Sequence, residues 1–493
     1  MKEKLYSLFK SLQEGLAPVN PSSQPDKMVI KDGILTEYHI SSSERELVLP
    51  QGIRSISGSV FHNCRNLERI ILPEGLKSIG KSAFGNCYSL KSVRLPESLS
   101  VIGESAFAGC ENLMQIFLPA NLNKLGDYAF RDCKHLKSMN LSSVKELGKG
   151  IFRNCTYLEE AFLPAECDVP AECFLYCNNL KTVRMPVSSA KIGAEAFRCC
   201  SSLTHVVLPP DVKVIEHGAF HYCAGLTGIQ LPEGVNTIEN YAFWGCESLE
   251  YAVIPSTVKR IGSFVFKECK SLKRIILREG IYEIGYEMFG KCISLKSIVL
   301  PKGVENISPL SFAGCSALEE ITIPETVIYI SKDAFQECSA LQNVIFRGIS
   351  FPVDAFCALD VFSTADDAIF YIMKALSPYE QKSEEDLITP QIASIYQYLF
   401  RSYCKSPEDK FLSEFVHQNL KQMFSSLILM KDGENIRNVL KQGTLVTKEN
   451  ITDWILYANQ KEAYEIQVIL SEYQHKALGY DSIEDTVRKK FEL

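Results

Sequence analysis

Long apolar runs and an excess of positive charge are both missing from this sequence. No segment approaches the roughly 18 to 20 apolar residues that a membrane-spanning helix needs. The 52 Lys and Arg are outnumbered by 59 Asp and Glu, which gives a formal net charge of −7 at pH 7. Because binding to a phosphate backbone depends on concentrated positive potential, the sequence predicts no nucleic-acid partner and no insertion into a membrane.

Familiar catalytic motifs are also missing. The sequence contains no GxSxG, HExxH or dinucleotide-binding fingerprint. Its eight His are dispersed and fall mostly where a surface residue is expected. An enzyme would need a nucleophile with a base, paired carboxylates or a metal cluster at workable spacing. We therefore expect no catalytic activity and no cofactor.

What the sequence does contain is a cysteine ladder. Of its 18 Cys, 13 recur every 23 residues, apart from two intervals of 22. Each of these Cys has a Phe three residues before it and a Leu three residues after it. The ladder consists of Cys64, Cys87, Cys110, Cys133, Cys155, Cys177, Cys200, Cys223, Cys246, Cys269, Cys292, Cys315 and Cys338.

Each apolar position of the repeat predicts a structural role. A period-two pair that usually ends in Pro, as in residues 93–96, predicts a short strand that the Pro terminates. An aliphatic residue follows, often with a Gly that allows a tight bend, as in residues 79–80. The closing Ala-Phe-x-x-Cys fits one helical turn. Such a unit cannot bury its apolar face alone, so the units must stack into a solenoid.

The spacing of the cysteines favours packing over chemistry. In a stack, each ladder Cys has two equivalent neighbours, which leaves no unique disulfide partner. Free Cys is commonly buried, so we expect reduced, inert thiols with a raised pKa. Cys167, Cys173 and Cys177 leave a zinc site as the weaker alternative, because paired CxxC spacing is missing.

The Ala-Phe-x-x-Cys ending resembles the BspA-like class of leucine-rich repeats over about residues 47 to 346. This resemblance implies an α/β repeat solenoid with a curved parallel sheet and short helical turns. It also implies an adhesion or interaction module that binds other proteins, often on a microbial surface. The N-terminal residues lack the pattern of a secretion signal. The sequence therefore predicts a cytoplasmic protein, with surface display or secretion as the alternative that the resemblance offers.

The composition predicts four segments. Residues 1–27 are expected to be helical, 28–56 to cap the solenoid, 57–362 to form about 13 units, and 363–493 to fold as an all-helical domain. A degenerate unit at 351–357 closes the repeats, and one helix is expected over 407–427. The end of the chain, 447–473, faintly resembles an ankyrin helix pair.

The contact surface for a partner is predicted from the strand residues that alternate with buried ones. These residues face outward on the concave sheet and form columns along the solenoid. Two Phe and several Val and Ile stand in one such column, and exposed apolar stripes mark interaction sites. The alternative is that β-branched residues simply suit strands. The candidate protein-binding residues are Arg94, Phe117, Phe162, Arg184, Tyr251, Ile276 and Val299.

These features predict a non-catalytic, monomeric scaffold that binds a protein, with adhesion to host or other proteins as the role that the resemblance implies. The alternative is an intracellular regulatory or adaptor module that docks through its helical C-terminal domain.

A charge placed in a core column should unfold the neighbouring repeats, whereas a change at an outward position should not. We expect Phe220→Asp to lower the melting temperature strongly, because an unpaired buried ion costs several kcal/mol, and Gln230→Ala to leave it unchanged. Thermal denaturation followed by circular dichroism compares the two variants. Equal melting temperatures would refute the column interpretation.

Overall fold

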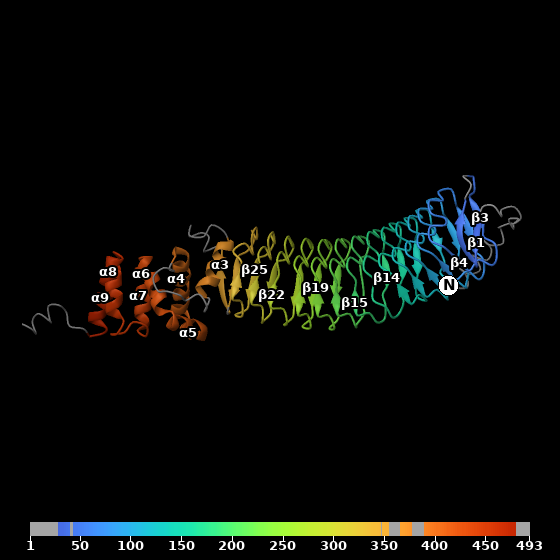
Figure 1. Cartoon of the computed structure of the whole chain (residues 1–493). Helices are drawn as coiled ribbons and strands as arrows, with labels where there is room; N and C mark the ends of the chain where they lie inside the picture. The colour runs from blue at the N-terminus through green and yellow to red at the C-terminus, as the bar shows by residue number, and fades with distance from the viewer. Residues whose placement is uncertain (1–27, 40–42, 347, 354–364, 377–388, 480–493) are drawn as a thin grey trace, which may run out of the picture. The chain divides into compact units, whose positions relative to one another are not determined.

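The computed structural model describes residues 28–39, 43–346, 348–353, 365–376 and 389–479 (Figure 1). The chain divides into two compact units, residues 1–281 with 287–294, and residues 282–286 with 295–493. The expected helical segment 1–27, the end of the degenerate unit and the expected boundary at 362/363 lie outside the described residues.

All but one of the described repeats contribute a first strand from their apolar–x–apolar pair, since residues 205–207 form none. These strands pair in parallel and in register, as predicted. In the first unit they are β3 (Glu46–Val48), β5 (Arg69–Ile71), β7 (Ser92–Arg94), β9 (Gln115–Ile116), β11 (Ser138–Asn140), β13 (Glu160–Phe162), β14 (Thr182–Arg184), β17 (Gly228–Gln230), β19 (Tyr251–Ile254) and β21 (Arg274–Leu277); in the second they are β23 (Ser297–Val299), β25 (Glu320–Ile323) and β27 (Asn343–Phe346).

Most repeats also contain a second, two-residue strand that the sequence analysis did not predict, whereas Val169 forms only an isolated bridge, with Ile192. The second strand ends at the aliphatic residue before the Gly position, and these strands also pair in parallel. In the first unit they are β4 (Ser55–Ile56), β6 (Ser78–Ile79), β8 (Val101–Ile102), β10 (Lys124–Leu125), β12 (Glu146–Leu147), β15 (Lys191–Ile192), β16 (Val214–Ile215), β18 (Thr237–Ile238) and β20 (Arg260–Ile261); in the second they are β22 (Glu283–Ile284), β24 (Asn306–Ile307) and β26 (Tyr329–Ile330).

Antiparallel strands close the series at both ends. At the N-terminal end, β1 (Met28–Lys31) pairs antiparallel with β2 (Ile34–Tyr38), which in turn pairs with β4. This hairpin lies within residues 28–56, for which the sequence predicts a cap. In the second unit, β28 (Ile349–Pro352) pairs antiparallel with β27. Both hairpins cover strands whose edges would otherwise be open.

A column of phenylalanine rings fills the core of each unit. The ring centroids of successive Phe lie 5.0 to 6.0 Å apart, and neighbouring rings are nearly parallel. Phe220, for example, is fully buried between Phe197 at 5.2 Å and Phe243 at 5.4 Å. The spacing is close to the distance of about 4.8 Å between paired strands, so rings and strands share one period.

The ladder cysteines are buried as predicted, and they also form hydrogen bonds. The Sγ atom of Cys223 donates to the carbonyl oxygen of Phe197 in the preceding repeat at 3.0 Å, and Cys87 donates in the same way to Phe61 at 3.1 Å. Burial raises the pKa of the Cys133 and Cys223 thiols well above the ordinary value. A small side chain that also donates a hydrogen bond therefore suits this column better than a purely apolar one.

The Ala-Phe-x-x-Cys segment is not a helical turn, which corrects the prediction. It folds as tight turns in which Cys64 N donates to Phe61 O at 3.1 Å. Phe61 N donates to Ala83 O in the next repeat at 2.8 Å, so the turns of neighbouring repeats are also hydrogen-bonded. Asn63 adopts a left-handed φ of 63°, which Asn tolerates better than most residues.

The Gly after the second strand also differs from its predicted role as a bend. A Cβ on Gly80 would lie 2.7 Å from the backbone N of Gly58 and 2.8 Å from Ile56 O. A Cβ added to Gly103 or to Gly126 would lie equally close to backbone atoms of the preceding repeat. Glycine is therefore suited to this position because neighbouring backbones approach closely there.

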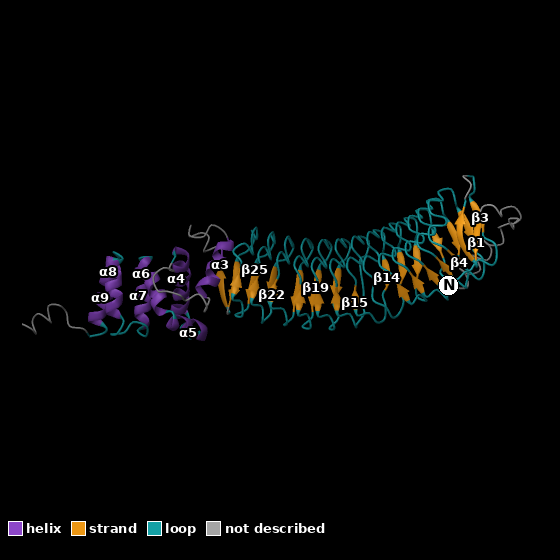
Figure 2. Ribbon diagram, viewed as in Figure 1, coloured by secondary structure: helices purple, strands orange, loops and turns teal. Residues whose placement is uncertain are grey.

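The C-terminal region is helical, as predicted (Figure 2). The one helix expected over 407–427 is instead two, divided at Asn419, whose Nδ2 donates to Phe415 O at 2.9 Å. Tyr398 Oη donates to Ser350 O at 2.7 Å, which connects the helices to the last hairpin. The described helices are α3 (Ala365–Leu376), α4 (Pro390–Lys405), α5 (Lys410–Gln418), α6 (Leu420–Leu429), α7 (Gly433–Gln442), α8 (Ile451–Gln460) and α9 (Tyr464–Lys476).

An aromatic cluster on the turns of the first unit surrounds a buried histidine. His221 is 8% exposed, and its ring stacks on Tyr222 at 4.4 Å and on Trp244 at 4.8 Å. Burial, together with the nearby Arg198 and His217, lowers the pKa of His221 to about 4.

This pKa predicts a pH-dependent contribution to stability. Below pH 6.5 the unfolded chain binds a proton at His221 that the folded chain rejects, so the free energy of unfolding falls between about pH 6.5 and 4. We expect this loss to reach about 2 to 3 kcal/mol and to be missing from His221→Phe. Urea denaturation of both proteins at pH 7 and pH 4.5 measures the difference. An identical pH dependence would contradict a buried neutral imidazole.

Burial also predicts which thiols react. At pH 8 a colorimetric thiol reagent should modify at most the half-buried Cys167, Cys199 and Cys404, together with Cys357, which lies outside the described residues. After denaturation without reductant, all 18 should react. A denatured count well below 18 would reveal disulfides, and a high native count would show that the core column is accessible.

Candidate functional site

The predicted contact column lies on the outer side of the first strands. In each unit taken by itself, we call this surface the strand face and define it by the residue between the two buried positions of each repeat. All 13 of these residues are exposed or half-exposed. They are Ile71, Arg94, Phe117, Asn140, Phe162, Arg184, Val207, Gln230, Val253, Ile276, Val299, Thr322 and Ile345.

Strand register brings two of the candidates together. Phe162 on β13 pairs directly with Arg184 on β14, and Asn140 on β11 pairs with Phe162 from the other side. Phe162 is half-exposed and Arg184 is exposed. An aromatic ring thus lies between an amide and a guanidinium group, in the order polar, aromatic, cationic. Such a row offers an apolar contact flanked by hydrogen-bond donors.

Tyr251 lies in the neighbouring outward column, on β19. A Cβ added to Gly228, its partner on β17, would lie 2.4 Å from the Tyr251 ring, so the ring lies over this glycine. On its other side Tyr251 pairs with Arg274 of β21. The Tyr251 side chain is 54% exposed, which leaves one face of the ring to solvent.

Other candidates are accessible but separate. Phe117 is 45% exposed and follows β9, where the first-strand sheet ends before β11 begins. Arg94 is exposed at the end of β7. Ile276, 38% exposed, belongs to the first unit, and Val299, 65% exposed, belongs to the second.

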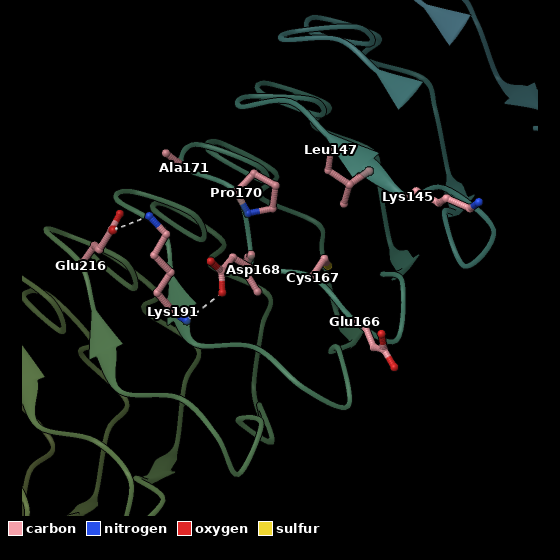
Figure 3. A pocket seen from close by; sticks show the side chains of 11 residues that line it. Lys145, Leu147, Glu166, Cys167, Asp168, Pro170, Ala171, Lys191 and Glu216 are labelled. Atoms are coloured by element: carbon pink, nitrogen blue, oxygen red, sulfur yellow. Dashed lines mark hydrogen bonds and ion pairs between the residues drawn. The ribbon is translucent and has the colours of Figure 1, made fainter. Parts of the chain in front are cut away.

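A pocket that the sequence analysis did not identify interrupts the second-strand series. It encloses about 340 Å³ beside the turn that carries Cys167 and Pro170. Figure 3 shows Lys145 and Leu147 across from this turn, and an ion pair between Lys191 Nζ and Glu216 Oε1 at 3.2 Å. The sequence signal was the pair of short repeats and the loss of Gly at position 170.

The chemistry of this pocket is not that of a reactive thiol. Cys167 is half-buried, and burial together with Asp168 raises the pKa of its thiol to about 11. Within the residues that the structure describes, no group of three or more His, Cys, Asp or Glu is arranged to hold a metal. The cysteines around Cys167 therefore offer no assembled zinc site in the described part of the chain.

Residues 75–82, GLKSIGKS, match the letters GxxxxGK[ST] of a phosphate-binding loop, a match that the sequence analysis missed. A functional loop of this kind connects a strand to a helix. Here Ser78 and Ile79 form β6, and Gly80 packs on the preceding repeat. The segment is an ordinary part of the solenoid.

No described helix has the length and apolarity to cross a bilayer.

Comparison with known proteins agrees with this architecture. The family model of the BspA type leucine-rich repeat region matches residues 37–159, 145–270 and 236–358, in six copies. A leucine-rich repeat protein from Bacteroides ovatus is 26% identical, with 66% of this chain and 94% of that one covered and a TM-score of 0.57.

A leucine rich cell surface protein from Faecalibacterium prausnitzii is 28% identical, with 68% and 95% covered and a TM-score of 0.43. No curated protein matches the sequence. The family model covers more than half of the chain. This chain therefore belongs to the BspA-type leucine-rich repeat family.

Proposed function

We propose that this protein is a non-catalytic scaffold that binds a protein partner through the strand face. The observation that carries the proposal is the accessible row formed by Phe162 and Arg184, with Phe117 two repeats away. The buried rings of Phe107, Phe130 and Phe152, in the same three repeats, lie 5.5 and 6.0 Å apart, so the two Phe stand two such repeat spacings from each other. One partner surface can therefore contact both rings.

The composition of the strand face supports a protein ligand. Val207 and Val299 are 84% and 65% exposed, and such positions bind water poorly. Aromatic and Arg side chains dominate the energetics of protein interfaces, and both kinds occur in this column. The family consists of repeat scaffolds, and a scaffold of this kind is compatible with protein binding.

A second candidate function involves the C-terminal helices. Leu456 on α8 and Tyr464 and Val468 on α9 are 56%, 61% and 57% exposed. Tyr464 and Val468 are four residues apart and share one side of α9. These side chains favour an adaptor in which α8 and α9 dock on another protein, as an intracellular regulatory module requires.

Location in the cell distinguishes adhesion from this second function. Protease treatment of intact cells should leave the full-length protein intact if it is cytoplasmic, as the sequence predicts. Loss of the protein from intact cells would support adhesion instead.

Replacing the two Phe should weaken partner binding without unfolding the chain. The full-length protein first captures its partner from a lysate, and the affinity of the purified pair is then measured by calorimetry. We expect Phe117→Ser with Phe162→Ser to lower that affinity by about tenfold or more. The melting temperature should change little, since neither ring is buried.

The same repeats offer a matched control. Met114 and Tyr157 are 52% and 51% exposed and stand outside the column. Met114→Ser with Tyr157→Ser should leave the affinity unchanged. Equal affinity for the two double variants would exclude the strand face as the contact surface.

A further inference from the structure

Neighbouring second strands are joined by a regular set of hydrogen bonds. Ser100 N and Val101 N donate to Lys77 O at 2.9 and 3.2 Å, and Gly103 N donates to Ile79 O at 2.8 Å. The next strand repeats this pattern, since Asn123 N and Lys124 N donate to Ser100 O and Gly126 N donates to Ile102 O. Each second strand thus offers two carbonyl oxygens to the repeat that follows it.

The repeat after β12 does not provide these donors. Its second-strand segment is as short as that of the β12 repeat, which keeps its donors, but here Pro170 stands where the Gly N–H is expected. Proline has no N–H to donate. Cys167 N donates to Ser188 O at 3.3 Å, in the repeat that follows it. Among the described residues, none donates to Lys145 O or Leu147 O, and β12 is the last strand of its sheet.

The irregular turn is instead attached to the next repeat. Asp168 Oδ1 accepts hydrogen bonds from Ala190 N at 2.8 Å and Lys191 N at 3.1 Å, and so replaces the carbonyl oxygen that a regular repeat supplies. Val169 N donates to Lys191 O at 3.2 Å, and Gly193 N donates to Val169 O at 2.9 Å. The gap in the hydrogen-bond pattern therefore lies between β12 and this turn.

This opening exposes an apolar side chain as well as a strand edge. Leu147 is half-exposed, whereas Leu125 and Ile192, its counterparts in the column, are 1% and 0% exposed. Leu147 lines the pocket of about 340 Å³ together with Val169, Pro170 and Ala171. The rest of the lining is largely charged, with Lys145, Glu166, Asp168, Lys191 and Glu216. An unpaired strand edge with an exposed apolar side chain beside it is the arrangement that accepts an added strand.

We propose that the edge of β12 binds an extended peptide segment of another protein, which adds to the sheet as a parallel strand. Two peptide N–H groups, spaced as in Val101 and Gly103, donate to Lys145 O and Leu147 O. A β-branched or aliphatic side chain of the peptide covers Leu147. This site belongs to the second strands and does not depend on the function proposed for the strand face.

The chain itself supplies a probe of the right pattern. A capped hexapeptide with the sequence of residues 99–104, LSVIGE, carries the donors that pair with a regular second strand. Its matched control replaces the glycine by sarcosine, which removes the N–H aimed at Leu147 O. Saturation-transfer-difference NMR on the full-length protein detects weak binding through the Val and Ile methyl groups of the peptide.

We expect saturation transfer to LSVIGE with an affinity about fivefold or more above that of the sarcosine peptide, the effect of one hydrogen bond. In the variant Pro170→Gly, which regains the N–H, binding of LSVIGE should fall by a similar factor. Pro232→Gly, in a regular repeat, should bind as the wild type does.

Equal affinity for the two peptides, or no transfer from the wild type, would overturn the proposal. Unchanged binding by a folded Pro170→Gly would overturn it as well. If that variant does not fold, the two peptides on the wild-type protein still decide the question.

Discussion

The structure depends on one constraint, which is that every repeat must bury its apolar residues against the repeat beside it. Phe rings stack at 5.0 to 6.0 Å, and the strands pair at nearly the same spacing. Ladder thiols such as those of Cys87, Cys223 and Cys338 donate to the Phe carbonyl oxygen of the preceding repeat. Because identical positions superpose, a residue type that recurs in the sequence becomes a column in space.

Both candidate sites are consequences of this constraint. Where the period is kept, outward residues such as Phe162 and Arg184 align in register on the strand face. In the second of two consecutive short repeats, Pro170 lacks the N–H that a regular repeat donates, and Cys167 N donates to the following repeat instead. The result is the opened edge of β12 beside Pro170. Regularity thus supplies a broad surface, and a local loss of regularity supplies a pocket.

The sequence was sufficient to predict the solenoid, its period and its buried columns. The Phe, Leu and Cys positions allow one stacking register, and the helical spacing of Ile392, Ile395 and Leu399 predicts burial on one side of α4. The turns were predicted less well. A-F-x-x-C has the spacing of a helical turn, but bonds to the next repeat impose a left-handed φ at residues such as Asn63.

The second strands were missed because a two-residue strand carries too little alternation to be recognised in a sequence. The pocket could be located by its missing Gly but not described, since the role of Asp168 depends on where Ala190 and Lys191 lie. For the strand face, the sequence predicted which residues point outward. It contains no information on what they bind.

The central claim is that the strand face is where the protein partner binds. Hydrogen-exchange mass spectrometry of the full-length chain, alone and with its captured partner, tests it most directly. The account predicts added protection in peptides that cover residues 114–118 and 159–185. Protection confined to the turns around His221 or to α8 and α9, with none on the strand face, would contradict it.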